Sequence, residues 1–241
     1  MSKYTYNKDY FKKIDSSDKA YWLGFLYADG CITRYYKGEE LRSMSLEITL
    51  QSQDIDHLIK FRDSLESNVP IQDRKIAGKY NANRIVINYT KMCRDLINLG
   101  CTPCKSLTLE FPTYDIVPEQ YIRDFIRGYF DGDGCVSYTE GDYYHSERGK
   151  KYRMHSYSCS FCGNENFLIS VRDILINNGI KVGEPRKDKR SNACSIYIYG
   201  VDNIEKFKKY IYTDDCICLS RKKEKFDYVD NNKDLHINRN L

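Results

Sequence analysis

The sequence contains two related stretches that decide the fold, AYWLGFLYADGCI at Ala20–Ile32 and FIRGYFDGDGCV at Phe125–Val136. Each one predicts a mostly apolar helix that ends in Asp-Gly-Cys and continues into a β-branched residue. In this correspondence Asp29 matches Asp133. Repetition within a chain indicates a duplicated structural unit, so we expect two halves with the same architecture.

The segments that follow the two stretches also correspond in order, as judged from hydrophobic periodicity. In the first half the pattern predicts helices at Ala20–Ala28, Ile55–Leu65 and Lys91–Leu99, and strands at Cys31–Tyr36, Arg42–Gln51, Ile71–Lys75 and Arg84–Tyr89. In the second half it predicts helices at the repeated motif, at Asn166–Asn177 and at Val201–Tyr212, and strands at Cys135–Thr139, Tyr152–Phe161, Lys181–Arg186 and Cys194–Tyr199. The sequence therefore predicts an α+β protein with two αββαββα halves, residues 1–113 and 114–241. Two prolines mark the join near Leu109–Glu119.

The two motif helices carry a glycine at the same internal position, Gly24 and Gly128. A glycine inside a helix costs about 1 kcal/mol relative to alanine, which is tolerable where another backbone must come close. We therefore expect the two helices to pack on each other at these glycines, across a pseudo-two-fold axis. Asp29 and Asp133 would then meet at one end of the pair, each just before a glycine that can take the left-handed conformation after a helix.

Two carboxylates at that position are electrostatically unfavourable. A negative charge at a helix C-terminus opposes the helix dipole, and two carboxylates side by side repel each other. A divalent cation between Asp29 and Asp133 would remove both penalties. The alternative is that each Asp-Gly simply ends a helix and starts a turn, which is a good explanation for one copy and a poor one for two matched copies.

Composition limits the remaining possibilities. The net charge of +4 allows a nucleic-acid partner without requiring one, and no run of apolar residues is long enough to span a membrane. The first residues, MSKYTYNKDYFKK, lack the apolar core of a secretory signal. We therefore expect an intracellular, reducing compartment in which the 10 cysteines are thiols. Two C-x-x-C pairs, Cys101–Cys104 and Cys159–Cys162, could form a zinc site, but they occupy non-equivalent positions, so we favour plain thiols.

The segments WLGFLYADG (Trp22–Gly30) and IRGYFDGDG (Ile126–Gly134) resemble the two motifs of a single-chain LAGLIDADG homing endonuclease. The resemblance covers roughly residues 8–228. The second motif is close to the family pattern, whereas the first has Tyr27 where an acidic residue is common and Trp22 where Leu is usual. Both copies keep the acidic residue that comes just before the final glycine of the motif, Asp29 and Asp133.

The resemblance implies a specific activity. The two four-stranded sheets would form a saddle on duplex DNA, and one phosphodiester in each strand would be hydrolysed across the minor groove to leave short 3′ overhangs. The metal, Mg²⁺ with Mn²⁺ as a substitute, would be held by Asp29, Asp133 and the backbone carbonyls of Ala28 and Gly132. Mg²⁺ needs no more than one or two carboxylates together with water and phosphate oxygens.

Further catalytic residues follow from the resemblance. A lysine is expected beside each scissile phosphate, Lys105 in the first half and Lys222 in the second, with Lys223 as the neighbouring candidate. The alternative for each lysine is an ordinary solvated basic surface. Polar residues that end the second strand of each half would organise water, and these are Gln51 (or Gln53) and Asn164.

Contacts to DNA are expected from outward side chains of the strands, because alternate residues share a face and a two-stranded ribbon fits the major groove. The candidates are Thr33, Tyr35, Arg42, Arg74, Lys79, Asn83, Arg84, Tyr138, Arg153, Arg186, Lys187, Lys189 and Arg190.

We therefore expect a monomeric, sequence-specific endonuclease whose double-stranded DNA site spans about two helical turns, or about 20 bp. The first alternative is an RNA maturase of the same fold that binds intron RNA to assist splicing, for which loss of a motif aspartate would be typical. The second is a transcription factor that keeps the fold alone. Both aspartates are present here.

Overall fold

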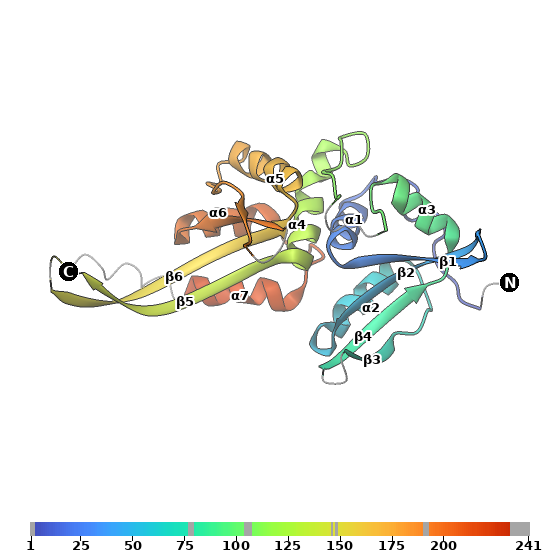
Figure 1. Cartoon of the computed structure of the whole chain (residues 1–241), viewed down its shortest axis with the longest axis horizontal. Coiled ribbons are helices and arrows are strands. Elements are labelled where there is room, and N and C mark those ends of the chain that lie inside the picture. Colours follow the sequence, from blue (N-terminus) through green and yellow to red (C-terminus); the bar gives the residue numbers. More distant parts are fainter. Residues whose placement is uncertain are drawn as a thin grey trace.

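The computed structural model describes residues 3–76, 80–103, 108–145, 147, 149–189 and 193–231. In this part of the chain the two halves lie side by side, and their motif helices α1 (Ser17–Asp29) and α4 (Ile122–Asp133) meet at the centre (Figure 1). None of the helices described is long and apolar enough to cross a lipid bilayer.

The first half follows the predicted order of elements. After α1 come β1 (Gly30–Lys37), β2 (Glu40–Gln51), the 3-10 turn η1 (Ser52–Asp54), α2 (Ile55–Ser64), β3 (Gln72–Ile76), β4 (Tyr80–Ile87) and α3 (Thr90–Asn98). The four strands form an antiparallel sheet in the order β1-β2-β4-β3.

The second half repeats this plan and adds one helix. It contains η3 (Glu119–Tyr121), α4, β5 (Gly134–His145), β6 (Lys150–Gly163), α5 (Glu165–Asn177), β7 (Arg186–Lys187), β8 (Cys194–Tyr199), α6 (Val201–Ile211) and α7 (Ser220–Asn231). Its antiparallel sheet has the order β5-β6-β8-β7, which matches the first sheet strand for strand. The prediction of a duplicated α+β fold is confirmed.

Two elements differ from the prediction. The strand expected at Lys181–Arg186 is reduced to β7, because Pro185 has no amide hydrogen for a ladder; Gly183 still donates to the Tyr197 carbonyl at 2.9 Å. The helix α7 was not expected, because its sequence, SRKKEKFDYVDN, shows no apolar stripe. It packs through Phe226, whose ring centroid lies 6.0 Å from that of Phe130.

The two halves are joined by direct contact between helix backbones. A Cβ built on Gly24 would lie 2.9 Å from the Phe125 carbonyl carbon and 3.0 Å from the Tyr129 nitrogen. A Cβ on Gly128 would lie 2.8 Å from the Phe25 nitrogen. No side chain fits at these distances, so the predicted glycine-to-backbone packing of α1 on α4 is confirmed.

The two sheets differ in the length of their first hairpin. The β5–β6 ladder continues to the pair His145–Lys150, although β6 contacts β8 only at Ser158–Gly163. The rest is a two-stranded ribbon that reaches well away from the other elements (Figure 1). The corresponding β1–β2 ladder ends sooner, at the pair Lys37–Glu40.

We predict that Gly24→Ala destabilises the protein, although alanine is the better helix former. The added methyl group must push the α4 backbone away, and overpacking of this kind costs about 1–3 kcal/mol. The free energy of unfolding in urea measures the effect. Gly141→Ala is the control, because nothing lies within 4 Å of a Cβ at that position; equal stability of the two variants would contradict the backbone contact.

Candidate active site

The two motif helices bring their acidic ends together. Asp29 and Asp133 are the last residues of α1 and α4, and both are exposed. A Cβ built on Gly132 would lie 3.3 Å from Asp29 Oδ2. The Asp29 carboxylate therefore lies against the residue that precedes Asp133, as the paired motifs predict.

The glycine after each aspartate has a different role from the one predicted. Gly30 has φ −75° and Gly134 has φ −83°, so neither takes the left-handed conformation. The strands β1 and β5 begin at these residues without an intervening turn. Glycine is needed for space instead, because a Cβ on Gly30 would lie 2.6 Å from the Leu26 carbonyl oxygen.

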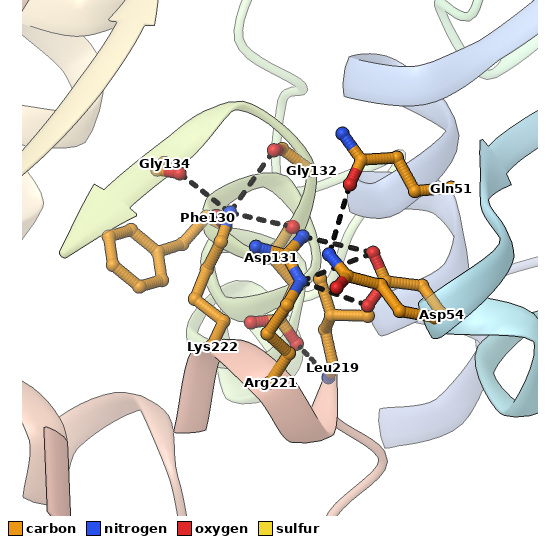
Figure 2. Close-up of polar contacts among 10 residues, drawn as sticks. Gln51, Asp54, Phe130, Asp131, Gly132, Gly134, Leu219, Arg221 and Lys222 are labelled. Carbon is orange, nitrogen blue, oxygen red and sulfur yellow. Dashed lines mark hydrogen bonds and ion pairs between the residues drawn. The ribbon is translucent and has the colours of Figure 1, made fainter. Parts of the chain in front are cut away.

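Lys222 of α7 points at the end of α4 (Figure 2). Its Nζ lies 2.7 Å from the carbonyl oxygens of Phe130 and Asp131, 3.1 Å from that of Gly132 and 2.6 Å from that of Gly134. Asp131 and Gly132 lie in the last turn of α4, where carbonyls have no partner within the helix, whereas the Phe130 carbonyl also accepts from the Gly134 amide. The ammonium therefore caps α4 and offsets the negative end of its dipole.

The surroundings of Lys222 distinguish it from Lys223. Lys222 is 6% exposed, and burial lowers the pKa of its ammonium to about 8, against the opposing effect of the Asp131 and Asp29 carboxylates. Lys223, one residue on, is half-buried and lies near Cys216. Of the two candidates, Lys222 is the one at the motif end, and it is held inside the protein rather than on an open basic surface.

Asp131 anchors the chain between α6 and α7. Its carboxylate accepts hydrogen bonds from the Tyr21 hydroxyl at 2.7 Å, the Tyr212 hydroxyl at 2.6 Å and the Leu219 amide at 2.7 Å. Burial raises the pKa of this carboxyl, and the three donors oppose that shift. In the first motif the same position is Tyr27, whose hydroxyl donates to the Leu99 carbonyl at 2.6 Å.

The start of α7 is also tied to the first half. Arg221 donates to both carboxylate oxygens of Asp54, with Nη2 to Oδ2 at 2.9 Å (Figure 2). Lys60 Nζ on α2 lies 3.2 Å from the Cys218 carbonyl oxygen and 3.2 Å from Ser220 Oγ. Asp54 is 4% exposed, so this ion pair is shielded from water on its acidic side. The sequence pattern gave no signal for these contacts between halves, because they join residues far apart in the chain.

His57 of α2 is buried beside Tyr21, one of the donors to Asp131. It is 1% exposed, and its Nε2 is 3.1 Å from the Tyr21 hydroxyl oxygen. Burial lowers the pKa of its imidazole to about 3. Its Nδ1 is buried with no hydrogen-bond partner among the described residues. His57 is therefore a neutral core residue.

The motif ends fit a divalent cation of the Mg²⁺ type. They present two carboxylates and the backbone carbonyls of two helix C-termini, which are hard oxygen donors, although the Gly132 carbonyl also accepts from Lys222 Nζ at 3.1 Å. Gly132 and Ala28, the predicted carbonyl ligands, are half-buried and in contact with each other. In the described residues no group of three or more His, Cys, Asp or Glu side chains is arranged to hold a metal.

The other predicted catalytic residues make local contacts of their own or fall outside the described residues. Gln51 ends β2 in an exposed position and accepts a hydrogen bond from Gln53 Nε2 at 3.0 Å (Figure 2). Asn164 is the N-cap of α5, where Oδ1 accepts from the Phe167 amide at 3.0 Å, and its Nδ2 donates to the Leu109 carbonyl. Both polar atoms of Asn164 thus serve the fold. Lys105 lies outside the described residues.

The outer face of the first sheet carries most of the predicted DNA contacts of that half. The exposed or partly exposed ones are Thr33, Tyr35, Arg42, Arg74 and Arg84. Arg74 and Arg84 both approach Glu47, at 2.6 and 3.6 Å, so two cations share one acid on this face. Lys79 lies outside the described residues.

Two predicted contacts face the other way. Asn83 is 4% exposed and donates to Asp73 at 2.8 Å; it neighbours Arg84, and adjacent residues of a strand point to opposite faces. Tyr138 shares the inner face with the buried Val136 and packs against Tyr157 with the rings tilted and their centroids 4.8 Å apart. The prediction that these two side chains lie on the outer face is wrong.

The outer face of the second sheet carries Arg186 beside aromatic side chains. Arg186, Lys187 and Lys189 are exposed, and the Arg186 guanidinium lies 5.8 Å from the centre of the Tyr197 ring. Lys187 pairs with the buried Cys194, so its side chain lies on the face opposite to that of Arg186, and the outward placement predicted for it is wrong. Tyr197 stacks on Tyr199, with centroids 5.7 Å apart. The alternation in CSIYIY (Cys194–Tyr199) could have identified both tyrosines from sequence. Arg153 lies on β6, its side chain undescribed, and Arg190 lies outside the described residues.

Comparison with known proteins agrees with this architecture. Residues 120–212 match the family model of the LAGLIDADG-like domain. No curated protein matches the chain. Similar solved structures include the LAGLIDADG meganuclease I-AabMI bound to uncleaved DNA (13% identity, 90% of this chain and 91% of that chain, TM-score 0.59), the K262A mutant of I-SmaMI (10%, 91% and 92%, 0.65) and the I-LtrWI LAGLIDADG homing endonuclease bound to target DNA (11%, 97% and 92%, 0.62). At these identities the structures show the fold, and with the family match they confirm the resemblance.

The buried imidazole predicts a pH dependence of stability. Unfolded His57 takes up a proton near pH 6.5, whereas the folded protein resists protonation down to about pH 3. The unfolded state thus binds more protons in this window, and stability falls as the pH drops below 6.5. At pH 5.5 the loss is roughly 1.4 kcal/mol.

His57→Gln removes this titration. The free energy of urea unfolding, measured at pH 7.5 and 5.5, should change less between the two pH values in His57→Gln than in the wild type, by about that amount. The same pH dependence in both proteins would show that His57 is not buried in its neutral form.

Proposed function

We propose that this protein is a sequence-specific, metal-dependent endonuclease that cuts both strands of duplex DNA. Residues 120–212 match the LAGLIDADG-like domain, and the fold is similar to that of a LAGLIDADG meganuclease over 90% of the chain. Its chemistry is hydrolysis of one phosphodiester per strand. The DNA partner follows from the proteins it resembles, since I-AabMI and I-LtrWI are bound to DNA in the structures named above.

One observation carries the proposal: the glycine contacts between α1 and α4 place the Asp29 carboxylate against Gly132, the residue before Asp133. Two acidic helix ends are thereby brought together between two sheets, where carboxylates are otherwise disfavoured. Binding of a cation, together with a phosphate, would offset the repulsion between these two carboxylates. No other described part of the chain combines paired acids with two exposed sheet faces.

When Mg²⁺ is bound, it offsets negative charge on the scissile phosphate and favours ionisation of water at neutral pH. The protein's own residues position the reaction. Asp29 and Asp133 would hold the ion, and Lys222 fixes the backbone at Gly132 by direct hydrogen bonding. The outer sheet faces, with Arg74 and Arg84 on one side and Arg186 on the other, would contact the phosphates and bases of each half-site.

Two kinds of lysine role are proposed at the ends of the site. Lys222 orients the end of α4 from inside the protein, and its positive charge stabilises negative charge at the motif end. Lys105 is proposed to stabilise negative charge beside the scissile phosphate of the other strand, without a structural role, on the strength of its position in the first half of the sequence.

We predict that Asp29→Asn and Asp133→Asn each abolish double-strand cleavage and leave DNA binding within a few-fold of the wild type. EDTA should stop the wild-type reaction, and Mg²⁺ or Mn²⁺ should restore it. The substrate is the uninterrupted form of the gene that hosts this reading frame, assayed on gels beside a binding titration. Asp18→Asn is the control, since Asp18 is an exposed acid at the other end of α1.

The same assay separates the alternatives. A maturase would bind intron RNA, leave DNA intact and show no dependence of RNA binding on the paired aspartates. Cleavage by either motif variant at the wild-type rate would overturn the endonuclease proposal.

Substitution of Lys222 and of Lys105 should differ in its effect on the free energy of unfolding. Lys222→Met leaves the α4 carbonyls without their charged donor, so we expect the free energy of unfolding to fall by about 2–3 kcal/mol. It should also slow single-turnover cleavage by about 10²–10³-fold, and Lys105→Met should match that kinetic loss with little change in stability. Lys223→Met is the control and should affect neither quantity. If Lys222→Met slows cleavage no more than Lys223→Met, Lys222 is only a structural cap.

A further inference from the structure

The first hairpin of the second half extends beyond the sheet to which it belongs. The strand β5 has 12 residues, whereas its counterpart β1 has 8. Both strands begin directly at the end of a motif helix, so the difference in length lies at the far end of the hairpin. We name the part of β5 and β6 beyond the Tyr138–Tyr157 pair, residues 139–145 and 150–156, the long ribbon.

The described side chains of the long ribbon have no share in the hydrophobic core. Residues 139–142, Tyr144 and Ser156 are all exposed, and nothing lies within 4 Å of a Cβ built on Gly141. A two-stranded hairpin on its own is only marginally stable in water. A ribbon of this length, which projects away from the other elements (Figure 1), therefore indicates a surface that serves a partner.

The long ribbon continues the outer face of the second sheet. Alternate residues of a strand share a face, so Thr139 follows Cys135 and Ser137 on the face opposite to the buried Val136. This is the face that carries Arg186. The ribbon runs from the motif end of α4 in the direction away from the first half (Figure 1). It therefore extends the proposed DNA-binding face outward from the paired aspartates.

The far half of the long ribbon is cationic in composition. Residues 143–145 and 150–153 read YYH and KKYR, which gives three cationic residues and no acidic one. The end of the first hairpin differs, because Arg42 there is paired with Glu40 at 3.0 Å. Lysine and arginine contacts to phosphates supply much of the affinity of a protein for DNA, and a two-stranded ribbon fits the major groove. Duplex DNA is therefore the partner that this surface suits.

Given the endonuclease function proposed above, on which this inference rests, we propose that the long ribbon binds target DNA farther from the cuts than the first half can reach. The recognised site is then longer on the side of the second half. A strand rises about 3.4 Å per residue, so the additional length of β5, 12 residues against 8, extends the reach by about 14 Å. Duplex DNA rises about 3.4 Å per base pair, so the second half contacts about 4 additional base pairs.

The test uses the target that the wild-type protein cuts, with the cut positions mapped on both strands. The duplex is then shortened one base pair at a time from either end, and the Kd of the wild-type protein is measured in EDTA, which keeps the DNA intact. We expect affinity to fall about 4 bp sooner on one side of the cuts than on the other. Loss of these outer base pairs should weaken binding by about tenfold or more.

A variant with a shortened ribbon assigns the longer side to β5 and β6. Replacement of residues 141–154 by Asn-Gly closes the Glu140–His155 pair with a two-residue turn and leaves a β5 close in length to β1. This variant should bind the full target about tenfold or more weakly than the wild type. It should bind the duplex that lacks the outer base pairs as well as the wild type does, and it should cut at the same positions.

A second variant keeps the ribbon and removes only charge. Lys150→Gln/Lys151→Gln should lower the salt dependence of binding to the full target by about two units of slope and leave binding to the shortened duplex unchanged. Lys206→Gln/Lys209→Gln is the matched control, because both lysines are exposed on α6, a helix that buries Phe207. The control should bind both duplexes as the wild type does.

The outcomes distinguish this inference from the endonuclease function. Equal tolerance to shortening on both sides of the cuts, or the same dependence on outer base pairs in the shortened variant as in the wild type, overturns the role of the ribbon and leaves the endonuclease intact. A wild-type protein that neither binds nor cuts duplex DNA overturns both. If sedimentation shows a dimer of the wild type and a monomer of the shortened variant, the ribbon contacts a second copy of this chain instead.

Discussion

The structure depends on the contact between two helix backbones at Gly24 and Gly128. Any side chain at these positions would overlap the opposite helix, with a Cβ less than 3 Å from carbonyl carbon or amide nitrogen. Because a helix advances only 1.5 Å per residue, fixing the crossing point fixes where both helices end. The separation of Asp29 from the end of α4, and the relative placement of the two sheets, both follow from this contact.

The pseudo-symmetry is broken where the motif ends are secured. In the first half Tyr27 reaches the Leu99 carbonyl with a neutral hydroxyl. In the second half the matching residue is the buried Asp131, which collects three donors. A buried carboxylate is costly unless it is fully hydrogen-bonded, so this arrangement requires the chain around Tyr212 and Leu219 to stay in place. The end of the second motif is therefore held by more hydrogen bonds at this position than the end of the first.

Much of the fold and the centre of the site could be predicted from sequence, because repetition and periodicity are local signals. The repeat located both motifs, and the mid-helix glycines gave the packing of α1 on α4. The sequence of α7 does not predict a helix, because Phe226 is the one buried apolar residue among its described side chains and no apolar stripe is present. Asn83 and Tyr138 are polar residues that share strand parity with the buried Ile85 and Val136, so both lie on the inner face although their side chains suit a DNA contact. The Arg221 ion pair with Asp54 has no local signal, since only the folded chain brings these residues together.

The reach of α7 into the first half has a consequence for synthesis on the ribosome. Asp54 pairs with Arg221, and Lys60, which also pairs with Asp56 at 3.7 Å, contacts Cys218 and Ser220. Cys218, Ser220 and Arg221 are made long after the first half. Domains generally fold as units during translation, the N-terminal one first. The first half is therefore made before the Arg221 partner of Asp54 emerges with α7. Completion of its surface is coupled to the synthesis of α7, so a truncated product lacking α7 would leave the buried Asp54 carboxylate without this partner.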